Sequence, residues 1–208
     1  MLRILSALAV SIILLEAPIV SFAAQPPTKK TSSNLPKSPE PFGLILGATT
    51  FGELKSIISK EGAKNEGAGY GEAKPSYGDN DPDGVANERI ILVDVSGLPL
   101  DNLEMARFGF FDDKLYLIKY TFRKNADFNK IYKQLEAKYG AGKSTGGFSD
   151  KGYEWAFSGG VFMNLKEEFF GDHKLIFIHN PLSSKVKQSN QQVYDEHIKK
   201  KASAPRGL

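Results

Sequence analysis

The chain contains no cysteine among its 208 residues. This absence excludes disulfides, cysteine nucleophiles and a lipid anchor on an N-terminal cysteine, so the folded part must be stabilised by apolar burial alone. Histidine is scarce as well, with three residues in the chain. No two of them are spaced four residues apart on a predicted helix, which is the arrangement that a helical zinc site uses.

Catalytic signatures are also missing. No G-x-S-x-G nucleophile elbow occurs in the sequence. Glu167 and Glu168 are adjacent in a predicted strand, where neighbouring side chains point to opposite faces and do not act on one bond. We therefore expect the protein to have no enzymatic activity.

Only one long apolar run exists, over residues 4–15. Glu16 and Pro18 interrupt this run after about twelve residues, whereas a membrane-spanning helix needs roughly 20. The run is therefore too short for a membrane span, and no second apolar span follows it.

The surroundings of this run are typical of a cleavable signal peptide. Arg3 precedes it, and the small residues Ser21 and Ala23 follow at the spacing that signal peptidase requires. We predict a signal peptide over residues 1–23, with cleavage after Ala24 as the alternative. The mature protein is then periplasmic or secreted.

The formal net charge of +3 is unevenly distributed. Lysines in the segment 24–41 and basic residues in the tail 183–208 leave the intervening segment 42–182 with a net negative charge. A nucleic-acid-binding domain carries its basic residues on the folded surface. We therefore expect no nucleic-acid partner.

Composition divides the mature chain into three parts. Residues 24–41 are rich in proline, serine and lysine, which predicts a disordered linker. Residues 42–182 form the predicted domain. The basic tail 183–208 carries a short apolar stripe that includes Tyr194 and Ile198, so we expect either one short helix or a frayed end.

Two similar halves are predicted within the domain, 42–124 and 125–182. The first begins with a helix capped at Thr49 or Thr50 and the second with a helix capped by Asp127. Predicted strands follow each helix, at Arg89–Val95, Ala106–Phe111, Leu115–Phe122, Tyr153–Phe157, Val161–Phe169 and Leu175–His179. The pattern indicates an α+β fold of two tandem helix-then-antiparallel-meander units, forming a helix-on-sheet layer sandwich.

A nucleotide-binding motif is matched only superficially. Residues 137–144 fit a relaxed phosphate-binding loop, but the match lies at the end of a predicted helix. A true phosphate-binding loop follows a strand and opens a helix, so that backbone amides face the phosphate. We expect no nucleotide.

The segment containing Asp79, Asp81 and Asp83 fits the first half of a calcium loop, with Gly84 at the turn position. The closing acidic ligand is missing, because Ile90 stands in its place. Two interpretations remain open: a calcium site, or an acidic turn in solvent.

These aspartates lie in a polar, glycine-rich stretch over residues 62–87, for which we predict a long structureless loop. Tyr70 and Tyr77 stand in it as candidate partner-binding anchors, with plain flexibility as the alternative. Trp155 is a further partner-binding candidate, with packing in the core as its alternative.

The sequence also carries a short resemblance. Phe42-Gly43-Leu44-x-Leu46-Gly47-Ala48-Thr49, followed by Glu53-Leu54, resembles the opening of small bacterial envelope proteins. These are the SmpA/OmlA outer-membrane-assembly lipoproteins and the related fold of the β-lactamase-inhibitor protein. The resemblance implies a non-enzymatic, protein-binding envelope domain that pairs helices with an antiparallel meander.

Taken together, these features predict an exported binding module that recognises another envelope or secreted protein, as an inhibitor or an assembly factor. The alternative is a domain that binds a small ligand or calcium through residues 62–87. A third alternative is a cell-envelope hydrolase assembled from residues that are distant in the sequence.

Overall fold

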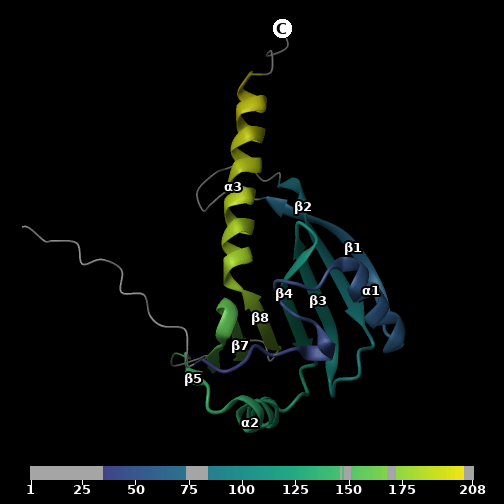
Figure 1. The fold of residues 1–208 in the computed structure, drawn as a ribbon, viewed down its shortest axis with the longest axis vertical. Coiled ribbons are helices and arrows are strands. Elements are labelled where there is room, and N and C mark those ends of the chain that lie inside the picture. The colour runs from purple at the N-terminus through teal and green to yellow at the C-terminus, as the bar shows by residue number, and fades with distance from the viewer. Residues whose placement is uncertain (1–34, 74–83, 146, 148–150, 168–171, 204–208) are drawn as a thin grey trace, which may run out of the picture. The chain divides into compact units, whose positions relative to one another are not determined.

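Eight antiparallel strands form one sheet in the computed structural model of the protein (Figure 1). Their order across the sheet is β1-β2-β3-β4-β8-β7-β6-β5. The strands are β1 (Lys64–Ala73), β2 (Val85–Ser96), β3 (Leu103–Phe111), β4 (Lys114–Phe122), β5 (Lys143–Ser144), β6 (Gly152–Ala156), β7 (Val161–Glu167) and β8 (His173–His179). The helices are α1 (Phe51–Lys60), α2 (Phe128–Tyr139) and α3 (Asn180–Ser203), with short 3-10 turns η2 (Pro41–Gly43) and η3 (Ser158–Gly160). The predicted α+β class with antiparallel strands is confirmed.

The structure describes residues 35–73, 84–145, 147, 151–167 and 172–203. The expected signal peptide, most of the linker, Tyr77, and the aspartates Asp79, Asp81 and Asp83 lie outside these residues. Among the helices that the structure describes, none combines the length and apolarity needed to cross a membrane.

Side-chain caps fix the first two helices where the sequence predicts them. Thr50 Oγ1 accepts a hydrogen bond from the backbone N–H of Glu53, and the Glu53 carboxylate accepts one from the backbone N–H of Thr50. This reciprocal pair is a capping box, which satisfies two backbone donors at the start of α1. Asp127 caps α2 with a single hydrogen bond, which its carboxylate accepts from the Lys130 N–H at 3.1 Å. Gly140, with φ of 81°, ends α2.

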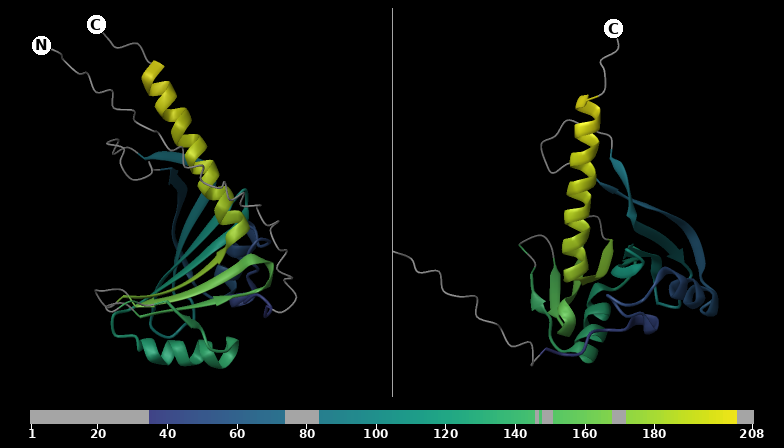
Figure 2. Two further views of the ribbon diagram at one scale, coloured as in Figure 1. Left: turned by 90° about the vertical axis from the view of Figure 1, so that its left-hand side faces the viewer. Right: turned by 45° about the horizontal axis from the view of Figure 1, so that its top comes forward.

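The two faces of the sheet are covered by different helices. Along β2, Val93 and Val95 lie in the large core that contains Leu54 of α1 and Phe128 of α2. The alternate residue Ile90 belongs to a second, smaller core with α3. Since successive residues of a strand point to opposite faces, α3 lies on the other side of the sheet from α1 and α2 (Figure 2).

Helix α3 is longer than the expected short tail helix, because its first half has a surface to pack on. Leu182 and Val186 contact Ile90 and Phe111 in the second core. The helix runs for 24 residues, and its C-terminal half extends past the strands in Figure 1.

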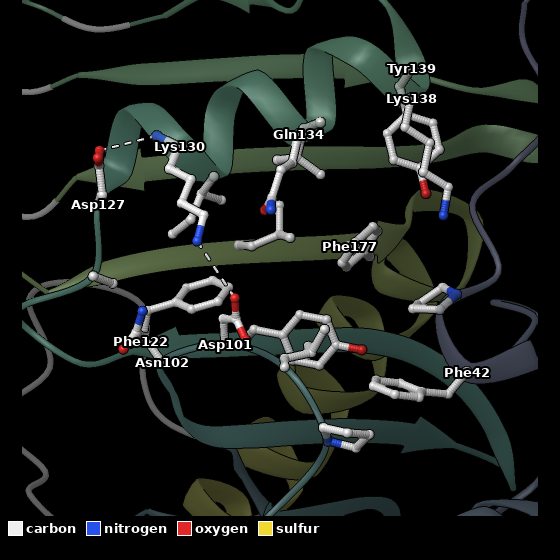
Figure 3. Close-up of a pocket in the computed structure, with 18 of the residues that line it drawn as sticks. Phe42, Asp101, Asn102, Phe122, Asp127, Lys130, Gln134, Lys138, Tyr139 and Phe177 are labelled. Atoms are coloured by element: carbon white, nitrogen blue, oxygen red, sulfur yellow. Dashed lines mark hydrogen bonds and ion pairs between the residues drawn. The ribbon is translucent and has the colours of Figure 1, made fainter.

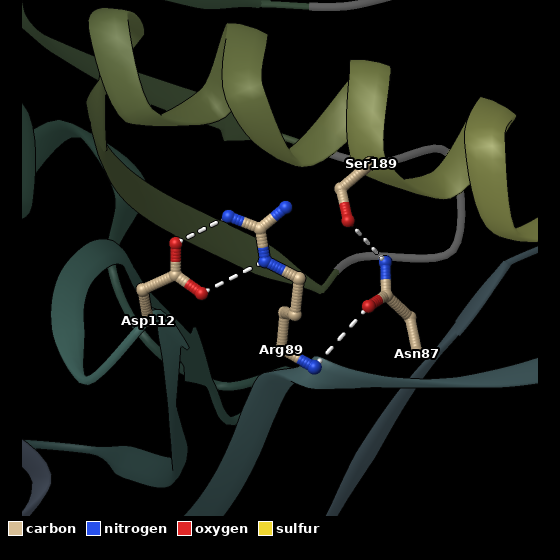
Figure 4. A network of polar contacts seen from close by, with 4 residues as sticks. All are labelled: Asn87, Arg89, Asp112 and Ser189. Atoms are coloured by element: carbon tan, nitrogen blue, oxygen red, sulfur yellow. Dashed lines mark hydrogen bonds and ion pairs between the residues drawn. The ribbon is translucent and has the colours of Figure 1, made fainter.

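Polar contacts also fix α3 to the sheet (Figure 4). Asn87 on β2 is 1% exposed. Its side-chain amide donates to Ser189 Oγ at 3.0 Å and to Asn190 Oδ1 at 2.8 Å. Beside it, Arg89 Nε donates to the Asp112 carboxylate at 2.9 Å.

Two predictions about unstructured segments are wrong in part. Residues 64–73 form the edge strand β1, and Val85 already begins β2, so the predicted structureless loop over 62–87 is ordered at both ends. Strand β1 is glycine-rich because it is an exposed edge with few side chains to bury.

The linker 24–41 is also ordered before its predicted end: Ser38 Oγ donates to the Ser158 carbonyl at 2.6 Å.

Candidate functional site

A cavity of about 520 Å³ lies on the face of the sheet that α1 and α2 cover. Its walls come from the segment 40–42, from the loop 99–102 after β2, and from one side of α2. Its floor is formed by four side chains of β4 and β8, namely Tyr120, Phe122, Leu175 and Phe177. The volume is in the range of small-molecule sites, roughly 300–1,000 Å³.

The floor and part of the helix wall are apolar. Tyr120 and Leu175 are opposite each other in the β4–β8 register. The ring of Tyr120 packs edge-to-face against Phe177, with 5.9 Å between ring centroids. From α2, Ile131 and Leu135 face the cavity one helical turn apart.

The hydroxyl of Tyr120 is the unusual polar group of this site. Tyr120 is 2% exposed, and its Oη has no hydrogen-bond partner among the described residues. Burial, with a smaller contribution from Tyr139, raises the pKa of Tyr120 well above its usual range, so the hydroxyl keeps its proton. Leaving such a group unsatisfied costs about 1–3 kcal/mol.

Two cavity residues have backbone conformations that side chains rarely adopt. Phe42 has φ of 55° and Asn102 has φ of 57°. Asparagine tolerates this left-handed region, but a bulky residue such as phenylalanine is strained there. Backbone hydrogen bonds hold both positions: Leu44 N–H donates to the Pro41 carbonyl at 3.0 Å, and Arg123 N–H donates to the Asn102 carbonyl at 2.9 Å. Strained residues of this kind are concentrated at ligand sites.

Charged side chains lie at the two ends of α2 along the cavity (Figure 3). At one end, Lys130 Nζ lies 3.6 Å from Asp101 Oδ2, beside the capping residue Asp127. At the other end are Lys138 and Tyr139, and the Lys138 ammonium lies 5.2 Å from the centroid of the Tyr139 ring.

The partner-binding candidates taken from the sequence do not meet at this cavity. Tyr70 is 61% exposed on β1 at one edge of the sheet. Trp155 lies on β6, toward the other edge, and is 6% exposed. Its indole Nε1 donates to the Gly140 carbonyl at 2.8 Å, and its ring packs on Gly142. Trp155 is therefore buried in the core, which favours the packing alternative over a role in partner binding.

No group of three metal-binding side chains occurs within the residues that the structure describes. The three aspartates of the calcium hypothesis, Asp79, Asp81 and Asp83, and the candidate Tyr77 lie in the segment that the structure leaves undescribed.

Tyr120 and the side of α2 that faces the cavity were not predicted from the sequence as site residues. The available signal was the repeat of Lys130, Gln134 and Lys138 at four-residue spacing, beside the apolar residues Ile131 and Leu135. A polar row beside an apolar row is also the ordinary pattern of a surface helix, so this signal does not distinguish a cavity wall.

Comparison with known proteins gives one match. Residues 40–189 fit the profile of the family described as the TP0088 domain. The chain belongs to this family. All residues that line the cavity, from Glu40 to Phe177, lie inside the TP0088 domain, whereas the outer half of α3 lies beyond it. No curated protein and no solved structure matches the chain.

The TP0088 match gives no support to the resemblance to SmpA/OmlA or to the β-lactamase-inhibitor protein. Membership of this family also does not identify a ligand or an activity for the protein. The function of the TP0088 domain must therefore be argued from the geometry of its cavity.

Proposed function

We propose that the protein is an exported, non-enzymatic binding module whose TP0088 domain takes up a small, largely apolar molecule. The observation that carries this proposal is the apolar cavity of about 520 Å³ over the buried residue Tyr120, whose hydroxyl lacks a hydrogen-bond partner within the described residues. Buried polar groups in native proteins are nearly always hydrogen-bonded. A bound ligand with an acceptor atom would satisfy this one.

The strained backbone at the cavity supports the same proposal. Phe42 places an aromatic side chain on the cavity wall from a left-handed conformation. This conformation costs about 1–3 kcal/mol and persists only where the surroundings impose it. A preformed binding site needs side chains that are held in place on its wall before the ligand arrives. The strained backbone at Phe42 is evidence that the surroundings hold this side chain in such a position.

Binding is tested with the neutral, apolar dye nile red, whose fluorescence rises in apolar sites. We expect saturable binding by the purified protein. Leu135→Trp places a large ring in the cavity and should abolish the fluorescence increase. Ile198→Trp is the matched control, because Ile198 lies on α3, outside the cavity and 37% exposed. Circular dichroism checks that both variants fold.

Equal nile red binding by the wild type and the Leu135→Trp variant would place the dye elsewhere and contradict the proposal. Failure of the wild type to bind would contradict it as well. Mass spectrometry of the protein purified from its native host under non-denaturing conditions then identifies any ligand that is retained.

Protein recognition is the second candidate function. Tyr70 is the most exposed of the large hydrophobic side chains on the described surface. It lies on β1, an edge strand whose free backbone groups are able to pair with a partner strand. Cross-linking in envelope extract, compared between wild type and Tyr70→Ala, tests this candidate. A partner captured equally by both proteins would exclude Tyr70 as its anchor.

Three further points remain proposals. We propose that the halves 42–124 and 125–182 are tandem helix-then-meander units, as the repeated order of one helix followed by strands predicts. We also propose a periplasmic or secreted location. Calcium binding at Asp79, Asp81 and Asp83 is tested by calorimetric titration, and the absence of heat at millimolar calcium would exclude it.

A further inference from the structure

The two edges of the sheet differ in length. Strand β5 forms one edge and is two residues long. Strand β1 forms the other edge and is ten residues long, and it is the outermost strand on its side of the sheet in Figure 1. A short edge strand offers few backbone groups to another chain, whereas a long one is a template for further pairing. The edge at β1 is therefore where a further strand can extend the sheet.

Strand β1 gains little from burial within its own chain. Its first seven residues, Lys64 to Tyr70, are all exposed. The strand also contains Gly67, Gly69 and Gly71, and glycine loses more conformational entropy on ordering than any other residue. Pairing with β2 holds one side of β1, and none of the described strands lies on the other side. A second strand there would stabilise β1.

The sequence of β1 suits antiparallel pairing with its own copy. The centre of the strand reads Gly67-Ala68-Gly69, so a two-fold axis at Ala68 places glycine opposite glycine on both sides of it. Two backbones approach closely at glycine because it has no side chain. Tyr70, which is 61% exposed, lies two residues from this centre and would pack across the strand of the second copy.

Charges at the two ends of β1 are complementary in this arrangement. Lys64 lies four residues before Ala68 and Glu72 lies four residues after it, so the lysine of each copy meets the glutamate of the other. A bulge at Glu66 shifts the pairing of β1 with β2 by one residue, so the two long side chains meet by their reach rather than by strict opposition. Parallel pairing would instead bring like charges together at both ends, which is unfavourable.

We infer that β1 pairs antiparallel with β1 of a second copy of this chain, so that the two sheets join across a two-fold axis near Ala68. The inference narrows the second candidate function, recognition through Tyr70 and β1, and does not depend on the cavity. The contact uses one strand from each copy, whereas obligate dimers bury roughly 2,000 Å² or more. The dimer should therefore dissociate on dilution.

Sedimentation equilibrium of the purified protein over a range of concentrations measures this self-association. We expect a reversible equilibrium between monomer and dimer. Lys64→Glu and Glu72→Lys should each weaken the dimer by about tenfold, because each change places like charges at both ends of the contact. Lys143→Glu is the matched control, since Lys143 is exposed on the opposite edge strand β5, and this variant should dimerise like the wild type.

A mixture of the two charge variants separates a loss of pairing from a loss of folding. In a mixed dimer of Lys64→Glu and Glu72→Lys, each end again joins a positive to a negative charge. The mixture should therefore dimerise about as tightly as the wild type, although each variant alone does not. A variant that is weakened because β1 no longer folds would not recover on mixing. Absence of recovery would overturn the inference.

The chain contains no cysteine, so a single introduced thiol tests the register directly. Ala68→Cys places two thiols opposite each other at the two-fold axis. Opposed Cα atoms of antiparallel strands lie about 4.5–5.5 Å apart, which is within the range of a disulfide. Oxidation by copper phenanthroline should convert this variant into a covalent dimer. Ser144→Cys, at an exposed position of β5, is the control and should stay monomeric.

The remaining outcomes each decide against the inference. A protein that stays monomeric at every concentration would overturn it and leave the edge of β1 to a different protein, which the cross-linking comparison with Tyr70→Ala tests. A dimer that is insensitive to both charge variants would place the contact elsewhere. Equal cross-linking of Ala68→Cys and Ser144→Cys would show random collision rather than pairing at β1.

Discussion

The side-chain amide of Asn87 on β2 donates a hydrogen bond to the hydroxyl of Ser189 on α3 at a distance of 3.0 Å. These residues are 102 positions apart in the chain, and both are buried. The contact joins the sheet to a helix that the sequence presents as a polar tail. It fixes the position of α3 on the second face of the sheet, where only a small apolar cluster packs.

Replacement of Asn87 by alanine should therefore lower the free energy of unfolding. The change leaves the buried Ser189 hydroxyl without this partner, and the expected loss is about 1–3 kcal/mol. Urea denaturation followed by circular dichroism measures it. Asn129→Ala is the control, because Asn129 is exposed on α2. A loss no greater than that of the control would show that the contact does not anchor α3.

Substitutions at two glycines of β1 test how this edge strand pairs with β2. A Cβ at Gly71 would overlap the side chain of Ile90 on β2, whereas a Cβ at Gly69 meets nothing within 4 Å. Gly71→Ala should destabilise the protein by about 1–3 kcal/mol. Gly69→Ala should be neutral or stabilising by up to about 1 kcal/mol. Thermal denaturation of both variants, run side by side, gives the comparison. Equal effects would mean that β1 does not pair with β2 in this register.

These cases show why the sequence predicts some elements and misses others. Caps at Thr50 and Asp127 and apolar runs in β2 to β4 are local signals, and the structure confirms them. Strand β1 lacks such a signal, because an exposed edge is stabilised by backbone pairing rather than by buried side chains. Even within β4 the alternation changes phase: a bulge at Tyr116 places Leu115 on the same face as Ile118.

The cavity was beyond local prediction for a different reason. Its walls come from three separate parts of the chain and its floor from two strands, and only the tertiary fold brings Phe42, Asn102 and Lys138 around one space. No property of Tyr120 in the sequence shows that its hydroxyl lacks a partner. That fact depends on every neighbour in the folded core.

The ion pair between Asp94 and Arg107 predicts a pH dependence of stability. Hydrogen bonds from the guanidinium, at 2.7 Å, lower the pKa of Asp94 below its usual value. A lowered folded-state pKa stabilises the protein above the unfolded value of about 3.9. This contribution is lost as the pH falls through the folded pKa. Because the pair is partly exposed, it contributes about 1 kcal/mol or less.

Asp94→Asn should remove that contribution, so the free energies of unfolding of the variant and the wild type should converge as the pH falls through the folded-state pKa of Asp94. Urea denaturation at a series of pH values measures the difference. Glu104→Gln, an exposed change on β3, is the control and should follow the wild type throughout. A constant difference between Asp94→Asn and the wild type at every pH would show that the ion pair is not the source.

Tyr120→Phe should change stability and affinity in opposite directions. Without ligand, removal of the unsatisfied hydroxyl should raise the free energy of unfolding by about 1 kcal/mol, because a buried polar group no longer loses its hydration. Tyr116→Phe, on the same strand but outside the cavity, should change it little. With nile red at saturating concentration this difference should narrow, since the hydroxyl strengthens ligand binding to the wild type and ligand binding stabilises the folded state. Thermal denaturation with and without ligand measures both effects. A Tyr120→Phe variant that is less stable than the wild type without ligand would show that the hydroxyl is already satisfied in the free protein.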